Sequence, residues 1–205
     1  MATSRPRTVL LVSGACFVLL ALSVAVLGTP PGDGAARDAL LAVAAPPLVA
    51  AMHAVNYAGS WKLLLPATLL LVVAFRHARE RWWVWIGLMI AAPATEGLLK
   101  IVIGRQRPED ASMGFPSGHA TSAAAFFGAV FYLAEPLPPQ VRRLVRTAAV
   151  ALVVLVAVAR VVLRAHWPSD ALAGFALGTA FVCAATLLAR PGKAAGTRGR
   201  GSCCV

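Results

Sequence analysis

The chain has 205 residues, of which 59% are hydrophobic and 13% charged, and its mean hydropathy is +0.76. Soluble domains are typically about 45–50% apolar and about 25% charged, so this composition excludes a water-soluble domain and disordered, collagen-like or disulfide-rich secreted chains. A net charge of +11 would indicate nucleic acid in a soluble protein, but in a membrane protein it sets orientation, and we predict no nucleic-acid partner. At about 20 residues per span, the length allows roughly six membrane helices.

The first predicted membrane helix covers residues 9–27, an uncharged run that follows two arginines. The run is longer than the apolar region of a signal peptide, and no small-residue cleavage pattern follows closely, so we expect it to be retained. A cluster of Pro and Gly at residues 29–34 ends it. The Ala-rich stretch at residues 35–59 contains a Pro-Pro pair, and we interpret it as a short interfacial or re-entrant helix.

Charged turns separate the later predicted helices. These helices cover residues 59–75, 83–103, 117–134, 147–163 and 169–188, with basic turns at 76–81 and 142–146 and a polar loop at 104–116. The predicted fold class is therefore all-α: a polytopic membrane protein with six transmembrane helices in one domain, residues 1–189. Residues 190–205 are rich in Gly, Lys and Arg and are predicted to be a disordered cytoplasmic tail. The role of Cys203 and Cys204 in this tail is left open.

The distribution of basic residues predicts the orientation in the bilayer. Twelve of the 19 Lys and Arg residues fall in the N-terminal segment, the two basic turns and the tail, and the other 7 fall between them. The positive-inside rule therefore predicts a multi-pass protein of the cell membrane with both termini in the cytoplasm.

Three polar clusters map to the predicted outer side, at the end of the third helix, the start of the fourth, and the junction of the fifth and sixth. They are Lys100-x6-Arg107-Pro108, Pro116-Ser117-Gly118-His119 and Arg160-x5-His166-x3-Asp170. Ionisable groups near membrane depth are costly and usually face a cavity or a partner. We therefore expect the clusters to converge on an anion site with acid–base groups, at the outer ends of the third to sixth helices.

The cationic and helix-start residues suit a phosphate group. Lys100, Arg107 and Arg160 supply three positive charges, and the planar arginine fork matches phosphate oxygens. Ser117 and Gly118 lie where a helix begins, and free backbone N–H groups at such a position bind anions. Ser117 can also cap the helix and donate its hydroxyl, and Gly118 lets the backbone approach a ligand closely.

His166 and Asp170 lie four residues apart across a predicted helix start. A carboxylate in this position can hold one nitrogen of the imidazole and leave the other free to attack an electrophile. Glu96 lies four residues before Lys100, which favours an ion pair on the helix surface. Arg105 and Arg164 flank the clusters, and we interpret both as contacts for a lipid headgroup.

The order and spacing of the three clusters resemble the type 2 phosphatidic acid phosphatase superfamily, whose pattern reads K-x6-RP, PSGH and SR-x5-H-x3-D. The resemblance covers residues 59–188, and one departure is Ala159, where the family usually has Ser. It implies that His166 attacks phosphorus and forms a phosphohistidine, that Asp170 orients His166, and that His119 protonates the leaving oxygen and then activates water. It further implies no metal and no cofactor. The residues implied to bind phosphate are Lys100, Arg107, Ser117, Gly118 and Arg160.

These observations predict an integral membrane lipid phosphatase, acting on a polyprenyl diphosphate such as undecaprenyl diphosphate or on a phosphatidyl-type phosphate. Three alternatives are weighed against it. A phosphotransferase of the same superfamily would use the same residues. A transporter would need charges at mid-span, and no inverted repeat is visible. A catalytically silent structural protein would be expected to lack a core motif position, and none is missing. The lipid and the oligomeric state are left open.

Overall fold

The computed structural model describes residues 4–190, and the regular structure within that range is helical apart from one isolated bridge between Gln106 and Met113. The all-α prediction is confirmed. Of the predicted tail, only Arg190 is described, and the rest, with Cys203 and Cys204, lies outside the described residues. The helices are α1 (Ser4–Leu27), α2 (Asp33–Ala42), α3 (Pro46–Tyr57), α4 (Trp61–Ala74), α5 (Arg76–Glu80), α6 (Trp82–Ile103), α7 (Gly118–Leu133), α8 (Pro139–Val162) and α9 (Pro168–Leu188).

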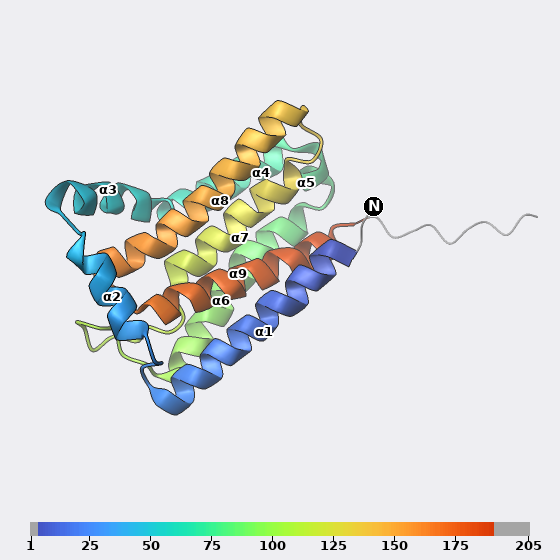
Figure 1. Ribbon diagram of the computed structural model, residues 1–205. Coiled ribbons are helices and arrows are strands. Elements are labelled where there is room, and N and C mark those ends of the chain that lie inside the picture. Colours follow the sequence, from blue (N-terminus) through green and yellow to red (C-terminus); the bar gives the residue numbers. More distant parts are fainter. Residues whose placement is uncertain (1–3, 191–205) are drawn as a thin grey trace, which may run out of the picture.

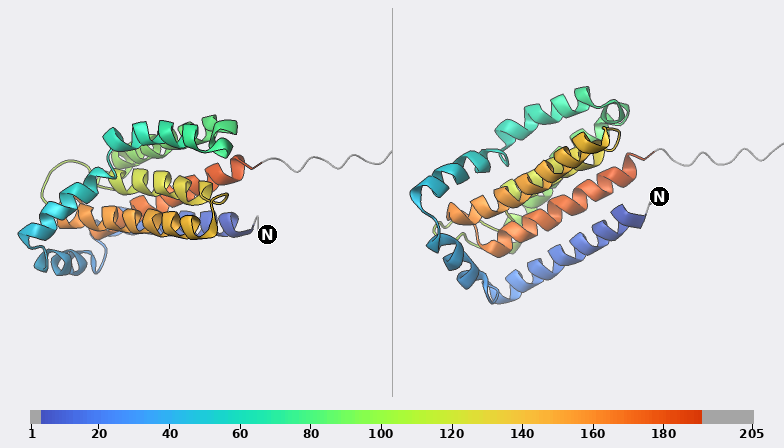
Figure 2. Two further views of the ribbon diagram at one scale, coloured as in Figure 1. Left: turned by 90° about the horizontal axis from the view of Figure 1, so that it is seen from above. Right: turned by 45° about the horizontal axis from the view of Figure 1, so that its top comes forward.

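Six of the described helices run along the bundle: α1, α4, α6, α7, α8 and α9. The short helices α2, α3 and α5 lie toward its two ends (Figures 1 and 2). Helix α9 packs against both α1 and α7, and α7 also packs against α8. Helices α2 and α3 bend around one end, which we call the α2 end. The start of α1, helix α5 and the turn between α7 and α8 lie at the other end, which we call the α5 end (Figure 1).

Four of the described helices are long and apolar enough to cross a membrane: α1, α6, α8 and α9. A fifth span results if α2 and α3, which meet at 116°, are taken as one broken span. Helices α4 and α7 are shorter, with 14 and 16 residues. The prediction of a polytopic membrane protein is thus confirmed, whereas six full-length spans are not found by length and hydropathy.

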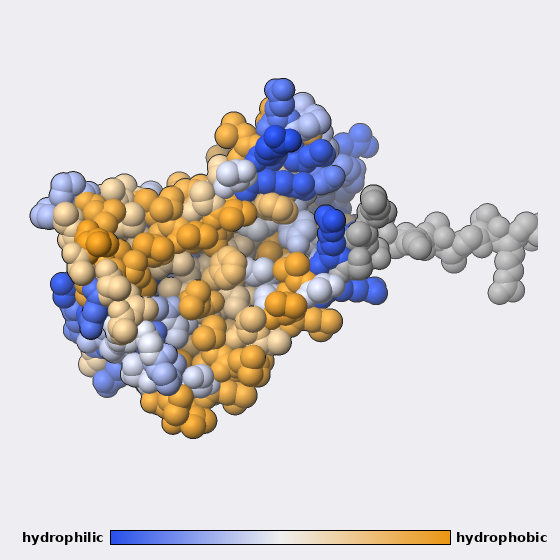
Figure 3. Space-filling view, viewed as in Figure 1, coloured by the Kyte–Doolittle hydropathy of each residue, from blue (hydrophilic) through white to orange (hydrophobic). Residues whose placement is uncertain are grey.

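The outward faces of the bundle are apolar, as expected of surfaces that contact lipid. Large side chains such as Leu11, Ile101 and Leu144 are about 70% exposed. Hydrophobic residues cover much of the flank, and hydrophilic residues gather toward the two ends (Figure 3). An exposed apolar band of this kind would be an aggregation surface in water but is the normal boundary with a bilayer.

Small residues let α7 and α9 approach closely. A Cβ atom added at Gly174 would lie 2.5 Å from the carbonyl oxygen of Ser117, and one added at Gly178 would lie closer still to that of Thr121. Because helices in lipid gain little from hydrophobic burial, such close backbone contact is an important source of their association. The same contact fixes the start of α7 against the start of α9.

Two local predictions differ from the structure. The arginines at 142–146 were expected in a turn, but α8 begins at Pro139 and includes them. Proline is well suited to a first helical turn, so the helix starts there despite the charges that follow. Residues 35–59 form parts of two helices, α2 and α3, because Pro46 and Pro47 start a new helix after a short break.

Candidate active site

The three polar clusters meet at the α2 end. Lys100 lies in the last turn of α6, Arg160 in the last turn of α8, and Asp170 in the first turn of α9. The backbone N–H of Ser117, just before α7, donates to the carbonyl oxygen of Asp170 at 3.0 Å. A Cβ added at Gly114 would lie 3.0 Å from Asp170 Oδ2 and 3.2 Å from Arg107 Cγ, which joins the α6–α7 loop to the cluster.

His166 and Asp170 form a buried pair. His166 Nδ1 lies 3.3 Å from Asp170 Oδ2, and the two side chains are 1% and 0% exposed. The backbone N–H of Trp167 donates to the same Oδ2 at 3.1 Å. Because Nδ1 faces the carboxylate, Nε2 of the imidazole is left on the opposite side of the ring. Burial lowers the pKa of His166 to about 4, and nearby Arg160 adds to this effect, so the imidazole is neutral at pH 7.

Several hydrogen-bond donors in the cluster are buried without a partner among residues 4–190. They are Ser117 Oγ, Arg107 Nε and Arg160 Nε. An unpaired buried donor is expensive, and a bound anion is a partner that such donors can share. Ser117, Arg107 and Arg160 are among the residues predicted from the sequence to bind phosphate, and that role stays a prediction.

The start of α7 differs in detail from the prediction. Ser117 occupies the N-cap position, but its side chain makes no capping hydrogen bond, so its hydroxyl remains available. Gly118 allows a close approach, yet the group it approaches is a protein carboxylate: a Cβ there would lie 3.0 Å from Glu96 Oε1. His119 follows in the first turn of α7, and Gly59 lets the α3–α4 turn pack against its backbone.

Glu96 and Lys100 form the predicted ion pair, with Oε1 and Nζ 2.5 Å apart, but not on the helix surface. Glu96 is only 8% exposed, because its face of α6 packs toward the start of α7. The prediction of a surface pair was therefore wrong, and Lys100 reaches the cluster with a buried counter-ion. Arg107 Nη1 lies 3.8 Å from Asp110 Oδ2, and the side chain of Asp110 is more exposed than that of Arg107.

The prediction for Arg105 was wrong. The residue was interpreted as a contact for a lipid headgroup, but its side chain is 6% exposed and is paired with two carboxylates, Asp33 and Asp170. Arg164 does lie on the surface, where it donates to Glu109 at 3.0 Å. That hydrogen bond lowers the pKa of Glu109, so its carboxylate is ionised at neutral pH.

Sequence reasoning gave no role in the site to three residues around the cluster: Asp33, Asn56 and Ser169. Asn56 Oδ1 accepts a hydrogen bond from Arg160 Nη1 at 2.8 Å. Its signal was present, because an amide on an otherwise apolar helix must find a polar partner. Asp33 gave no such signal, since it lies in a Pro- and Gly-rich turn far along the chain from the motifs.

Comparison with known proteins settles the family. Residues 81–192, more than half of the chain, match the model of the PAP2 superfamily. The chain belongs to this superfamily. The crystal structure of a transmembrane PAP2 type phosphatidylglycerolphosphate phosphatase from Bacillus subtilis is similar, with a TM-score of 0.74 and 26% identity, covering 88% of this chain and 94% of that one.

Curated PAP2 relatives act on different lipids, as their names state. Phosphatidylglycerophosphatase B of Bacillus subtilis is 29% identical over 79% of this chain and 85% of its own. Lipid A 1-phosphatase of Rhizobium johnstonii is 33% identical over 55% of this chain and 51% of its own length. Decaprenylphosphoryl-5-phosphoribose phosphatase of Mycobacterium tuberculosis is 34% identical over 58% of this chain and 65% of its own.

Ala159, where the chain departs from the PAP2 pattern, packs among apolar side chains. Ala159 is fully buried and forms a small apolar cluster with Met52 of α3 and Val162 of α8. A hydroxyl at this position would be placed among apolar groups. In this PAP2 protein the neighbouring Arg160 is instead held by Asn56, also from α3.

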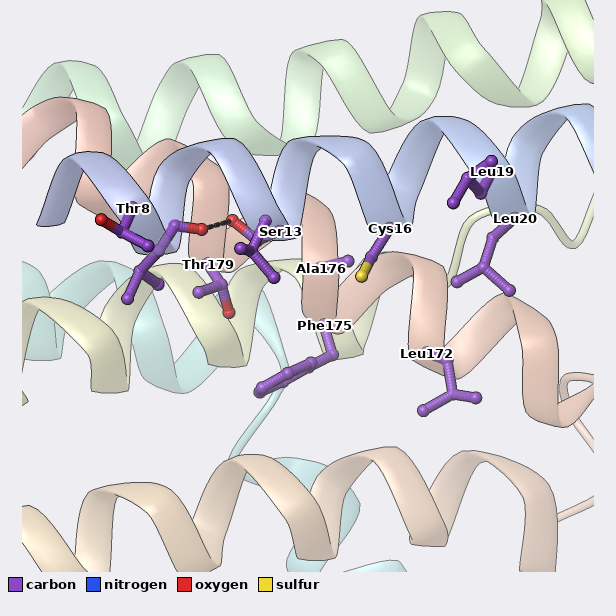
Figure 4. Close-up of a pocket in the computed structure, with 11 residues that line it drawn as sticks. Thr8, Ser13, Cys16, Leu19, Leu20, Leu172, Phe175, Ala176 and Thr179 are labelled. Carbon is purple, nitrogen blue, oxygen red and sulfur yellow. Dashed lines mark hydrogen bonds between the residues drawn. The ribbon is translucent and has the colours of Figure 1, made fainter. Parts of the chain in front are cut away.

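An apolar groove of about 660 Å³ runs along α1 and α9. Figure 4 shows Leu19 and Leu20 of α1 with Leu172 and Phe175 of α9 around it. Within α1, the hydroxyl of Ser13 donates a hydrogen bond to the carbonyl oxygen of Val9, shown as a dashed line in Figure 4. Its lining, all within the described residues, includes none of the predicted site residues of this PAP2 protein.

Proposed function

We propose that this protein hydrolyses a phosphate ester or diphosphate of a lipid through a phosphohistidine intermediate. The observation that carries the proposal is the group of buried, unpaired donors on Ser117, Arg107 and Arg160, next to the buried His166–Asp170 pair. Together they form a site for a phosphoryl group beside a neutral nucleophile. The names of the PAP2 relatives support a lipid phosphate as the substrate.

In the proposed first step, His166 Nε2 attacks phosphorus, a P–N bond forms, and the P–O bond to the lipid breaks. His119 gives its proton to the leaving oxygen, which is needed because an alkoxide leaves poorly. Asp170 holds Nδ1 and stabilises the positive charge that develops on the imidazole. Lys100, with the arginines of the site, neutralises the charge on the transferring group.

In the second step, water attacks the phosphohistidine. The now neutral His119 takes a proton from the water as its oxygen bonds to phosphorus. The P–N bond breaks and its electrons return to His166. Inorganic phosphate is released, and both histidines regain their starting states. The backbone N–H groups at the start of α7, near Gly118, help to hold the phosphoryl oxygens in both steps.

The acid-quench experiment tests this mechanism directly. Protein mixed with a lipid phosphate labelled in its terminal phosphoryl group should carry an acid-labile, base-stable label, and His166→Ala should carry none. His53→Ala, on α3 and exposed, is the matched control and should label as wild type does. A phosphoenzyme that persists in His166→Ala would refute the assignment of the nucleophile.

We propose that the site faces away from the cytoplasm, with all six predicted helices crossing the bilayer. The excess of basic residues at the α5 end supports this orientation, and a lipid phosphate at the outer leaflet would then reach the site. A periplasmic reporter fused after Gly114 should be active and one fused after Arg79 silent. The reverse pattern would place the chemistry in the cytoplasm.

A further inference from the structure

Arg105 lies at the centre of a buried network behind the proposed nucleophile. Its Nη1 atom donates to Asp170 Oδ1 at 2.7 Å and to Ser169 Oγ at 2.6 Å, and its Nη2 atom donates to Asp33 Oδ2 at 2.7 Å. The ring of Trp167 lies against the guanidinium, with Arg105 Cζ 5.2 Å from the ring centroid. Both Nη atoms of Arg105 are thus engaged by protein groups, and only its Nε atom is buried without a partner among the described residues.

Asp33 brings the N-terminal part of the chain into this network. It lies at the start of α2, outside residues 81–192 that match the family model, and its side chain is only 3% exposed. Its Oδ1 atom accepts from the backbone N–H of Ser169 at 2.8 Å, and its Oδ2 atom accepts from the hydroxyl of Ser169 at 2.5 Å. Asp33 therefore fixes both Arg105 and the first turn of α9.

The network divides the two oxygens of Asp170 between two tasks. Oδ1 accepts from Arg105, whereas Oδ2 faces His166 Nδ1 and accepts from the backbone N–H of Trp167. A carboxylate held at one oxygen cannot rotate freely, so the other oxygen keeps one direction toward the imidazole. Through Asp170, the orientation of His166 depends on Arg105, and the position of Arg105 depends on Asp33.

The charge of Arg105 and the charges of Asp33 and Asp170 also compensate one another. Asp33 and Asp170 are two buried carboxylates on opposite sides of a single guanidinium. Loss of Arg105 would leave two negative charges facing each other with little solvent to screen them, and breaking such a buried set by removal of one member is strongly unfavourable. Loss of Asp33 alone would leave Arg105 paired with Asp170 but free to shift.

We propose that Arg105 and Asp33 are positioning residues for the nucleophile, which hold Asp170 so that His166 Nε2 points at the phosphoryl group. The proposal deepens the function proposed above and rests on it for the identity of the nucleophile. It assigns Arg105 no contact with the phosphate, and it gives the first turn of α2 a part in positioning the nucleophile.

Ligand binding without turnover tests this proposal. Orthovanadate binds best when a nucleophile adds to it in trigonal-bipyramidal geometry, so its affinity reports the direction of His166 Nε2, whereas inorganic phosphate binds through the donors of the site alone. In Arg105→Gln we expect vanadate to bind about 10-fold or more weakly and phosphate to change less than about 3-fold. A loss of about 10-fold or more is typical when a group that orients metal-binding histidines is removed, and we expect a similar loss here. The dissociation constants can be measured by calorimetry in detergent.

A set of variants makes the result specific. Arg105→Lys should recover part of the lost vanadate affinity, because it restores the charge. The double variant Asp33→Asn with Arg105→Gln should bind vanadate better than Arg105→Gln alone, because it removes the unbalanced carboxylate. Arg143→Gln, which changes an exposed arginine near the α5 end, is the control and should leave the ratio of the two affinities unchanged. If Arg105→Gln does not fold, Asp33→Asn, which keeps the size of the side chain, decides the question and should weaken vanadate selectively.

Two outcomes would overturn the proposal. Equal weakening of vanadate and phosphate in Arg105→Gln would make Arg105 a phosphate ligand, and unchanged affinity for both in Arg105→Gln and Asp33→Asn would make the network irrelevant to the site. The proposed function is judged separately, because a wild-type protein that binds both anions but hydrolyses no lipid phosphate would refute that function alone.

Discussion

At the α5 end of the bundle, arginines pair with carboxylates that are exposed to solvent. Arg76 donates to Glu80 one helical turn away, and their side chains are 83% and 53% exposed. Arg146 pairs with Glu135, which is 70% exposed. Ion pairs of this kind contribute about 0–1 kcal/mol to stability, because water screens them and both side chains lose freedom.

At the α2 end, arginines are buried and hydrogen-bonded in fixed directions. Arg160 and Arg105 are each 8% exposed. Arg160 is held by Asn56, and Arg105 is held by carboxylates that include Asp170. Placing a charge in such surroundings costs several kcal/mol unless its partners compensate, so the surrounding residues must be in place before the charge can act.

From this contrast we infer that the basic residues at the two ends serve two separate purposes. The carboxylate partners at the α5 end are exposed to water, as expected where basic residues set orientation in the bilayer. The arginines at the α2 end are fixed by neighbours from α2, α3 and α9, as expected of a preorganised site. Matched substitutions at the two ends can test this contrast.

The largest contrast is expected between two histidines. His119→Ala should slow hydrolysis of a lipid monophosphate by about 10²–10⁴-fold, since the alkoxide then leaves without a proton. In the first step on p-nitrophenyl phosphate the loss should be much smaller, because p-nitrophenolate needs no proton to leave. The second step, in which His119 activates water, should be slowed on both substrates. His77→Ala, at the α5 end and exposed, should match wild type on both substrates. Single-turnover kinetics in detergent would check this, and equal losses in the rate of the first step for His119→Ala on both substrates would remove it as the leaving-group acid.

The next contrast is between arginines. Arg160→Ala should lower kcat/KM by about 10²–10³-fold, the range for loss of one donor to a developing oxyanion. Arg143→Ala, an exposed arginine near the α5 end, should change kcat/KM less than about 2-fold, as expected for a surface charge. Similar losses in both variants would mean that overall charge, rather than a fixed arginine, promotes the reaction.

A smaller effect is expected at Asn56, which holds Arg160. Asn56→Ala should lower kcat/KM about 10-fold, equivalent to about 1.4 kcal/mol and close to the contribution of a hydrogen bond to a charged group. Asn56→Asp keeps the acceptor but adds a negative charge beside Arg160, so it should mainly raise KM for the anionic substrate. Kinetics of the two variants side by side would separate orientation from charge, and wild-type rates in both would show that Arg160 is positioned without Asn56.

The parts of this molecule that could be predicted are those set by local sequence. The spacing of the residues around His119 and His166 predicts a common site, and the long apolar runs predict membrane helices. The approach of α7 to α9 depends on Gly174 and Gly178, which in the sequence are only two small residues in an apolar run. Their effect could not be predicted because it requires knowing which helix lies opposite.

The partners of the charged residues were the least predictable part. Arg105 is separated from Asp33 by 72 positions and Asn56 from Arg160 by 104, so no local rule connects them. The length of α8 was underestimated because its first turns carry Arg142 and Arg143, which were counted as a turn. A buried ion pair depends on the way helices pack, and a pattern within one segment does not contain that information.

The smallest expected effect is that of a chelator, for which we predict no change in rate. The side chains around the proposed phosphate position include Lys100, Arg107 and Arg160, whose charges would repel a divalent cation from the place where one would assist the reaction. The carboxylate closest to the nucleophile, Asp170, has its oxygens directed at Arg105 and at His166. Rates measured in excess EDTA should therefore equal those in buffer alone. Activity that is abolished by EDTA and restored by Mg²⁺ would mean that a cation supplies the charge assigned here to these side chains, and the contrast between the two ends would lose its catalytic meaning.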